Sequence, residues 1–315
     1  MSNHPFKKFI GKKSNAAIKE NFKQEKKAAK KERAAAIEKH FAEKRKAKDQ
    51  PVKSDKKKPV TTQKNNSTAS SEPMPLNKYL AHCGVASRRE AVDVIKDGHV
   101  TVNGNKVLEP AFRVTGTDSV ALNGKKLSIV QNLVYLLLNK PKDYLTTTND
   151  PQNRKTVLQL IKNATNERVY PVGRLDRNTS GVLLITNDGE LTQKLTHPSF
   201  NVKKIYEAKL DKPLSKAHFS QILEGVILED GEIHADALAY ADDHDKSVIG
   251  IEMHSGRNRI VRRIFEHLGY EVKALDRVMY AGLTKKNVER GKWRFLNEKE
   301  IRLLKYMNQK KKGAR

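Results

Sequence analysis

The first 72 residues differ strongly in composition from the rest of the chain. This difference predicts that only the later part of the chain forms folded domains. They contain 21 Lys and Arg against 8 Asp and Glu, and their apolar residues are scattered. Such a segment cannot bury enough apolar surface to offset the conformational entropy lost on ordering. We therefore expect residues 1–73 to form a disordered, Lys-rich arm and residues 308–315 a short basic tail.

The whole chain carries a net charge of +26 over 315 residues, which indicates an anionic partner. RNA is the abundant intracellular polyanion, an anionic membrane surface is an alternative, and a tail that only aids solubility is a second one. No apolar run approaches the ~20 residues that cross a bilayer, and the amino terminus lacks the apolar core of a signal peptide. Cys83 is the only cysteine, which excludes a disulfide framework. We expect a cytoplasmic monomer that does not enter membranes.

Residues 74–120 have the pattern of a small folded domain that begins with two helices. The first helix is indicated by apolar residues at helical spacing, Leu76, Tyr79 and Leu80. Ser87 and Glu90 match a capping box, which predicts a second helix starting at Arg88. Gly98 stands where that helix should end.

Two Asn-Gly pairs follow these helices, and the first of them predicts a tight hairpin turn. Asn103-Gly104 lies between short runs of alternating apolar and polar residues. Asn123-Gly124 follows the predicted end of the small domain, and we interpret residues 121–132 as a linker.

The small domain is expected to bind RNA through basic side chains on its surface. The candidates are Lys78, Arg88, Arg89 and Lys96. Two adjacent arginines at the start of a helix oppose its dipole and favour a nearby anion, although they are also compatible with a solvated helix face. The run PLNKYLAHCGVASRREAVDVIKDGHVTVNG resembles the S4 RNA-binding domain, which implies an RNA-binding α/β unit here.

From residue 133 to residue 307 the pattern changes to longer strands mixed with helices. Apolar runs typical of strands occur at 134–138, 182–185 and 248–251. Helices are predicted at four places: 156–162, 191–196, 216–224 and 258–268. Because strands and helices do not alternate regularly, we expect an α+β domain around an antiparallel or mixed sheet.

A candidate catalytic carboxylate precedes one of these strands. Asp176 ends the sequence Gly-Arg-Leu-Asp and lies just before the apolar run at 182–185. A loop anchored to a buried strand is a rigid position from which scaffolds present functional groups. The alternative is an ordinary aspartate that caps the local turn.

A second candidate site is the cluster of arginines at the start of the helix predicted at 258–268. Arg257, Arg259, Arg262 and Arg263 occur within seven residues. A helix built only for stability would carry acidic residues there, so the arginines indicate RNA phosphate or a buried carboxylate nearby. A basic helix face without a catalytic role is the alternative. The sequence contains no nucleotide-binding Gly-rich loop, zinc-ligand spacing or nucleophile-elbow motif.

Taken together, four motifs resemble the RsuA/RluB group of ribosomal-RNA pseudouridine synthases. They are LNKPKDYL, GRLDRNTSGVLLITNDGEL, KIYEAKL and SGRNRIVRRIFEHLGYEVKALDRVMYAGL, in that group's order and over about residues 74–305. An S4 domain ahead of the catalytic domain is also that group's arrangement.

The resemblance implies specific roles for four side chains. Asp176 corresponds to the essential aspartate, and Tyr206 to the tyrosine that stacks on the target uracil. Arg262 corresponds to the basic residue that pairs with the aspartate, and Arg174 to the arginine that replaces a flipped base. Arg257 and Arg259 are expected to bind RNA. No cofactor is implied, because the reaction breaks a glycosidic bond and rejoins the uracil through C5 without redox change or group transfer.

Two positions depart from the usual motifs, and two alternatives stay open. Asp143 replaces a glycine, and Ile260 replaces a glutamine or glutamate.

The run 196–200 is more similar to the large-subunit branch of the group, so 23S rRNA is the expected substrate and 16S rRNA or tRNA the alternative. The chain could bind free RNA or an assembly intermediate. A non-catalytic S4-domain ribosome-assembly factor is the other alternative.

Overall fold

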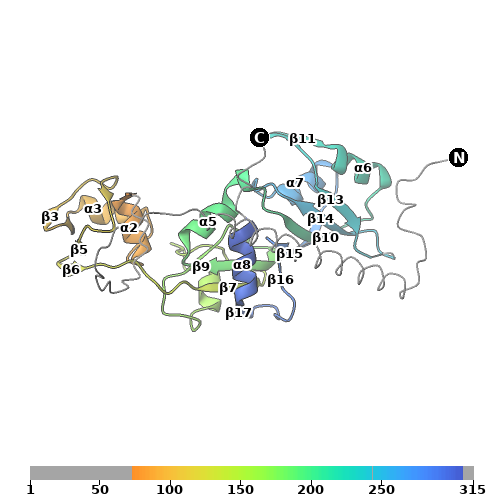
Figure 1. Cartoon of the computed structure of the whole chain (residues 1–315). Coiled ribbons are helices and arrows are strands. Elements are labelled where there is room, and N and C mark those ends of the chain that lie inside the picture. The colour runs from red at the N-terminus through yellow and green to blue at the C-terminus, as the bar shows by residue number, and fades with distance from the viewer. Residues whose placement is uncertain (1–72, 243, 308–315) are drawn as a thin grey trace, which may run out of the picture. The chain divides into compact units, whose positions relative to one another are not determined.

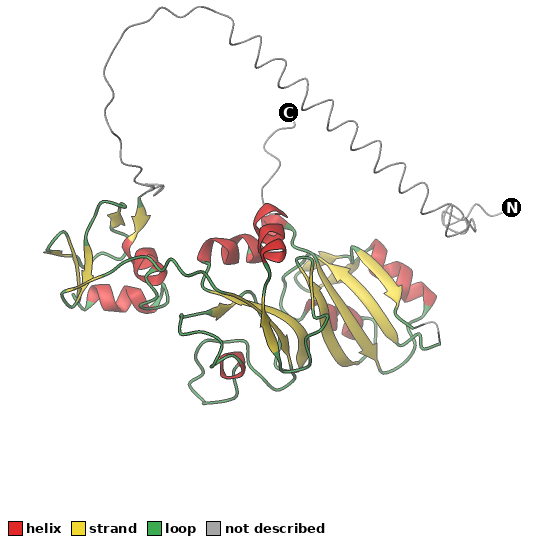
Figure 2. Cartoon of the chain, turned by 60° about the horizontal axis from the view of Figure 1, so that its bottom comes forward, coloured by secondary structure: helices red, strands yellow, loops and turns green. Residues whose placement is uncertain are grey.

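The computed structural model describes residues 73–242 and 244–307 (Figures 1 and 2). The predicted basic tail at 308–315 and the predicted arm, except for Pro73, lie outside the described residues. None of the helices in the described ranges has the length and apolarity of a membrane span.

The small domain packs two short helices against a small sheet. Helices α2 (Leu76–His82) and α3 (Glu90–Lys96) cover a four-stranded sheet of order β3-β2-β5-β6. Its strands are β2 (Val100–Val102), β3 (Asn105–Lys106), β5 (Val120–Leu122) and β6 (Lys125–Lys126), and a separate pair is formed by β1 (Met74–Pro75) and β4 (Arg113–Val114). Leu76, Leu80 and Ile95 are fully buried in the core between them.

The predicted capping box is confirmed. The Ser87 main-chain N–H donates to the Glu90 carboxylate at 2.8 Å, and the Glu90 N–H donates to Ser87 Oγ at 3.2 Å. The helix α3 begins at Glu90 rather than at Arg88, a difference within the usual uncertainty of helix ends. Arg88 and Arg89 therefore lie just before the first regular turn.

The predicted hairpin turn at Asn103-Gly104 is confirmed, and Asn123-Gly124 forms a second turn of the same kind. Asn103 and Asn123 have positive φ angles of 52° and 48°, as tight two-residue turns require. The second turn connects β5 to β6, and Leu127 and Ile129 pack against the core. The sheet and the core of the small domain therefore include part of the segment interpreted as a linker, because β6 pairs with β5.

The larger domain is built on one nine-stranded sheet of order β13-β14-β10-β15-β9-β7-β17, with β16 beside β15 and β8 beside β9. Its strands are β7 (Tyr135–Lys140), β8 (Tyr170–Pro171), β9 (Thr179–Thr186), β10 (Lys204–Leu210), β13 (Ala237–Tyr240), β14 (Val248–Met253), β15 (Val272–Tyr280), β16 (Leu283–Thr284) and β17 (Trp293–Phe295). Only β9 and β15 pair in parallel; the other pairs are antiparallel. The expected α+β class with a mixed sheet is confirmed (Figure 2).

Helices pack against this sheet close to the predicted positions. They are α4 (Val157–Leu160), α5 (Gly189–Thr196), α6 (Lys216–Glu224), α7 (Ile260–His267) and α8 (Glu298–Met307), with a short 3₁₀ turn at Pro198–Phe200 and a small hairpin of β11 (Val226–Leu228) and β12 (Gly231–Ile233). The last helix, α8, was not predicted. Its apolar side is confined to a few residues, such as Ile301 and Leu304, which pack against the core.

Gly181 marks a close approach of two strands at the centre of the sheet. Its φ is +111°, and a Cβ added there would lie 2.2 Å from the main-chain oxygen of Arg277 and 2.5 Å from its nitrogen. Gly181 and Arg277 are partners in the parallel β9/β15 pairing. A side chain at position 181 would therefore push the two strands apart.

We expect Gly181→Ala to lower the free energy of unfolding by about 3 kcal/mol, since it combines overpacking with backbone strain. Urea denaturation of the purified variant measures this change. Gly250→Ala is the matched control in strand β14, where the nearest atom to an added Cβ is 3.8 Å away. Equal stability of the two variants would contradict the close approach.

Candidate active site

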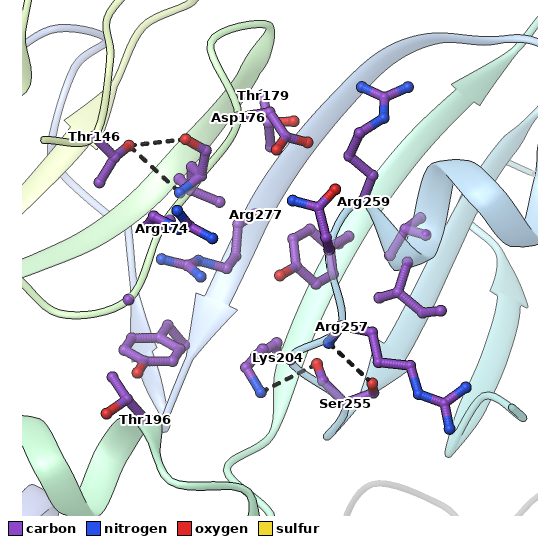
Figure 3. Close-up of a pocket in the computed structure, with 18 of the residues that line it drawn as sticks. Thr146, Arg174, Asp176, Thr179, Thr196, Lys204, Ser255, Arg257, Arg259 and Arg277 are labelled. Carbon is purple, nitrogen blue, oxygen red and sulfur yellow. Dashed lines mark hydrogen bonds between the residues drawn. The ribbon is translucent and has the colours of Figure 1, made fainter. Parts of the chain in front are cut away.

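A cavity of about 620 Å³ opens in the larger domain, a size that suits one small ligand or nucleotide (Figure 3). It is lined by the Gly-Arg-Leu-Asp loop, by strands β10 and β15, and by the segment that leads into α7. Segments 100 residues apart in sequence meet here because β9, β15 and β10 are adjacent in the sheet.

Asp176 lines this cavity from a loop with well-defined anchors. Gly173 starts the loop with a positive φ of 72°, and Thr146 Oγ1 donates to the Leu175 carbonyl at 2.8 Å. The Asp176 carbonyl accepts from Thr179 N–H at 3.0 Å. Its carboxylate accepts no hydrogen bond from any residue in the described ranges. The turn-capping interpretation is therefore not supported, and the carboxylate is free to meet a ligand.

A buried lysine holds the same loop from behind. Lys140 is fully buried, and its ammonium group donates to the carbonyls of Asp176 at 3.1 Å, Arg177 at 3.2 Å and Thr179 at 2.8 Å. A fourth bond reaches the Pro141 carbonyl at 3.0 Å. Burial lowers the pKa of Lys140 to about 8, so the group keeps its proton at neutral pH. This cation fixes the main chain at the catalytic candidate and directly after it.

The departure at position 143 fits its backbone. Asp143 has a φ of 67°, in the left-handed region that glycine adopts most easily and aspartate tolerates. Its carboxylate lies 3.2 Å from Nε of Arg177, and its N–H donates to the Arg177 carbonyl at 2.9 Å. The turn is therefore preserved and gains an exposed ion pair with the Asp176 loop.

Tyr206 faces the cavity from the centre of β10. It is half-buried and packs against two of the apolar clusters of the larger domain. Its partners in register are Ile251 on β14 and Arg277 on β15. A ring held this way offers a flat, rigid surface to a ligand in the cavity.

Arg262 lies behind the cavity wall rather than in it. Its guanidinium donates to the Val272 carbonyl at 2.8 Å and to the Asn178 carbonyl at 3.2 Å, and Nε is buried without an acceptor. The ion pairs of the described residues include none between Arg262 and Asp176, so the implied direct pair is not formed here. Burial and then the nearby charge of Arg259 lower the pKa of Arg262, while the charge of Asp176 acts in the opposite direction.

The three remaining arginines predicted at the site line the cavity. Arg174 and Arg259 are exposed, and Arg257 is partly buried. Arg257 donates to the Gly231 carbonyl at 3.0 Å, and Arg259 forms an ion pair with Glu266 at 3.1 Å. Arg259 has a φ of 48° directly before α7, a strained position that places its side chain at the cavity rim (Figure 3).

The RNA-binding candidates of the small domain lie on its surface. Arg88, Arg89 and Lys96 are exposed, and Lys78 on α2 is partly buried. They remain predicted phosphate contacts, separate from the residues that line the cavity of the larger domain.

Comparisons with known proteins identify both domains. A model of the RNA pseudouridylate synthase family matches residues 134–267, and an S4 domain model matches residues 74–120. A protein of Bacillus subtilis (strain 168) named ribosomal large subunit pseudouridine synthase B is 40% identical over 242 residues, which cover 76% of this chain and 98% of that protein.

The chain belongs to the S4-domain ribosomal-RNA pseudouridine synthases, the RsuA/RluB group. It is therefore an enzyme of the pseudouridine synthase family. A large-subunit pseudouridine synthase B of Buchnera aphidicola subsp. Baizongia pistaciae (strain Bp) is 36% identical to the synthase over 73% of this chain and 96% of that protein. A solved structure described as a pseudouridylate synthase aligns with a TM-score of 0.54 and 26% identity, over 73% of this chain and 99% of that one.

Sequence reasoning missed two cations of the synthase that line the cavity, the partly buried Lys204 and the buried Arg277. Lys204 donates to the carbonyls of Val202, His254 and Ser255, and thereby fixes the loop that leads to α7. One signal was available for Arg277: it stands two residues after Leu275 in a strand whose alternate residues are buried, so it occupies an inward-facing position.

Proposed function

We propose that the synthase isomerises one uridine of large-subunit ribosomal RNA to pseudouridine, in the cytoplasm and as a monomer, with Asp176 as the catalytic residue. The observation that carries this proposal is the Asp176 carboxylate, which faces the cavity without a hydrogen-bond partner among the described residues. The substrate class is supported by the names of the two relatives, which assign both of them to the ribosomal large subunit.

The target uridine must leave the helical stack before it can react, since its glycosidic bond and C5 are otherwise inaccessible. Extrusion costs a few kcal/mol, and cationic side chains around the cavity offset part of it. Arg174, exposed at the cavity, is placed to occupy the vacated space. Tyr206 supplies the surface against which the uracil stacks.

In the proposed reaction the C1′–N1 bond breaks and its electron pair stays on the uracil. After the ring turns, C5 attacks C1′, the C5 proton leaves, and N1 gains a proton, so the product is an isomer of the substrate. Asp176 acts ionised in each of three routes: as nucleophile at C1′, as nucleophile at C6, or as base at C2′.

A pseudouridine map of ribosomal RNA from a deletion strain tests this proposal. We expect one uridine of 23S rRNA to lose its modification and to regain it when the purified synthase acts on the RNA. Loss of a site in 16S rRNA or tRNA would instead support the alternative substrates. An unchanged map would favour a non-catalytic ribosome-assembly factor and would exclude the proposed activity.

Deleting residues 1–72 should weaken RNA binding without slowing the chemistry. This segment carries a net charge of +13, and the dependence of affinity on salt grows with the number of phosphates that a protein neutralises. We expect affinity at 50 mM salt to fall roughly tenfold and the slope of log K against log salt to flatten, while the single-turnover rate on saturating RNA stays unchanged.

A chain of full length, with glutamine in place of each lysine and arginine of this segment, is the matched control. It should bind like the deletion variant if charge is what matters. An unaltered salt slope in both variants would show that the segment does not bind phosphates.

A further inference from the structure

We propose that Arg277 is a further catalytic residue, which donates hydrogen bonds to uracil O4 and stabilises the negative charge that develops there during the reaction. The inference rests on the proposed function and concerns the same cavity. It follows from the position, the burial and the missing partners of the Arg277 guanidinium.

Arg277 occupies the centre of the sheet next to both parts of the active site. Its strand, β15, lies between β10 and β9. Arg277 pairs in register with Tyr206 on β10 and with Gly181 on β9, five residues after Asp176. The side chain lines the cavity together with Tyr206 and Asp176, and Figure 3 shows its guanidinium next to the Arg174 side chain.

The guanidinium is held rigidly but is left largely without acceptors. Its Nε–H donates to the Val182 carbonyl at 2.8 Å, and the group stacks over the Tyr280 ring at 4.5 Å from the centroid. No other hydrogen bond joins it to a residue of the described ranges, and Nη2 is buried and unpartnered. Arg277 is only 2% exposed, so water does not replace the missing acceptors. A buried donor without an acceptor is destabilising, and more so when it is charged.

The positive charge of Arg277 is also not neutralised by a carboxylate. None of the ion pairs among the described residues involves Arg277. A second cation that lines the cavity, Lys204, is partly buried, and its pKa is lowered to about 8 by burial and then by Arg277. Two cations in one cavity, one of them buried with free donors, form a preorganised site for negative charge.

Negative charge develops on uracil O4 in each of the three routes proposed for Asp176. Heterolysis of C1′–N1 leaves the electron pair on the ring, where it is delocalised onto O2 and, through C5 and C6, onto O4. Attack at C6 sends the ring electrons towards C5 and O4. In this proposal Arg277 contributes hydrogen bonds and charge but no proton transfer. Such stabilisation acts in the transition state more than in the ground state, and so raises kcat.

The uracil is a better occupant for this group than an RNA phosphate. Arg277 lies on the wall formed by the central strands, beside the tyrosine that is placed to stack on the base. The exposed cations that line the cavity, which include Arg174 and Arg259, are within reach of a solvated phosphate. We therefore assign the phosphates to the exposed arginines and the base oxygen to Arg277.

The test combines enzyme variants with single-atom changes in the RNA. Hairpins that carry the mapped site contain uridine, 4-thiouridine or 2-thiouridine at the target, and single-turnover rates are measured for wild type and Arg277→Met. Sulfur accepts hydrogen bonds weakly. We expect the rate penalty of Arg277→Met to be about tenfold smaller on 4-thiouridine than on uridine, and the same within twofold on 2-thiouridine and uridine. Because all rates come from the same preparation, a misfolded fraction cancels from this comparison.

Two further variants separate a catalytic from a structural role. Arg277→Lys keeps a charged donor and should restore part of the activity that Arg277→Met removes. Arg290→Met is the matched control: Arg290 bonds to Asp276 and Asn139 and does not line the cavity. Its rate penalty should be equal on uridine and 4-thiouridine.

Equal penalties of Arg277→Met on all three RNAs would overturn the role of Arg277 and leave the proposed function intact. Failure of the wild-type synthase to convert uridine in RNA that carries the mapped site would overturn the proposed function, and with it this inference. The two failures are therefore distinguishable.

Discussion

Asp176→Asn is expected to lower the single-turnover rate of pseudouridine formation by at least about 10⁴-fold while RNA affinity stays within about twofold. The amide is neither a nucleophile nor a base, so each of the three routes through this residue is blocked. The carboxylate makes no hydrogen bond to the described residues, so its replacement removes no interaction on which the loop depends. Tritium release from C5-labelled rRNA measures the rate, and a filter-binding titration measures the affinity.

Asp143→Asn is the matched control for this variant. Asp143 is an exposed carboxylate next to the Asp176 loop, and it does not line the cavity. We expect its rate to change by less than about tenfold, since an exposed ion pair contributes at most about 1 kcal/mol. Wild-type turnover by Asp176→Asn would show that the proposed mechanism is wrong.

Lys140→Met is expected to lower the free energy of unfolding by about 3 kcal/mol and the single-turnover rate by at least about 100-fold. Methionine has a similar length but cannot donate, so the carbonyls of Pro141, Asp176, Arg177 and Thr179 are deprived of a shared buried donor. These carbonyls define the path of the catalytic loop, and a displacement of about 1 Å can reduce a rate 100-fold. Urea denaturation and single-turnover kinetics measure the two effects.

Lys142→Met is the matched control in the same turn. Lys142 is exposed, so its replacement should alter the free energy of unfolding by no more than about 0.5 kcal/mol. If the two variants were equally stable, the four hydrogen bonds of Lys140 would contribute nothing to the loop.

Much of the local structure was predictable because short-range chemistry decides it. The capping box at Ser87 and Glu90 and the turns at Asn103 and Asn123 depend on residues within a few positions of one another. Helix α6 has the predicted bounds, and α7 begins two residues later than predicted. Strand β6 was not predicted, because two lysines alone carry no strand signal and β6 is a strand only through its pairing with β5.

The residues of the candidate site could be predicted from the sequence, but the hydrogen bonds and ion pairs among them could not. Asp176, Tyr206 and Arg174 were found from motifs, and the sheet brings all three to one cavity. Arg262 was expected to pair with Asp176, yet it donates to main-chain carbonyls instead. A hydrogen bond depends on positions to within a few tenths of an ångström, and these follow from how α7 packs on the sheet rather than from spacing along the chain.

By itself the sequence determined where the chain folds, which residue types occur in each segment, and that an aspartate, a tyrosine and several arginines occur in one family's order. Only the tertiary structure decided which of these groups meet. The order β10-β15-β9 brings Tyr206, Arg277 and the Asp176 loop to one wall, and the burial of Lys140 and Arg277 follows from that order. Pairing between strands that are far apart in sequence determines which charged groups lie near one another, which side chains are buried and which donors lack an acceptor. These properties depend on neighbours across the sheet, so the spacing of residues along the chain does not predict them.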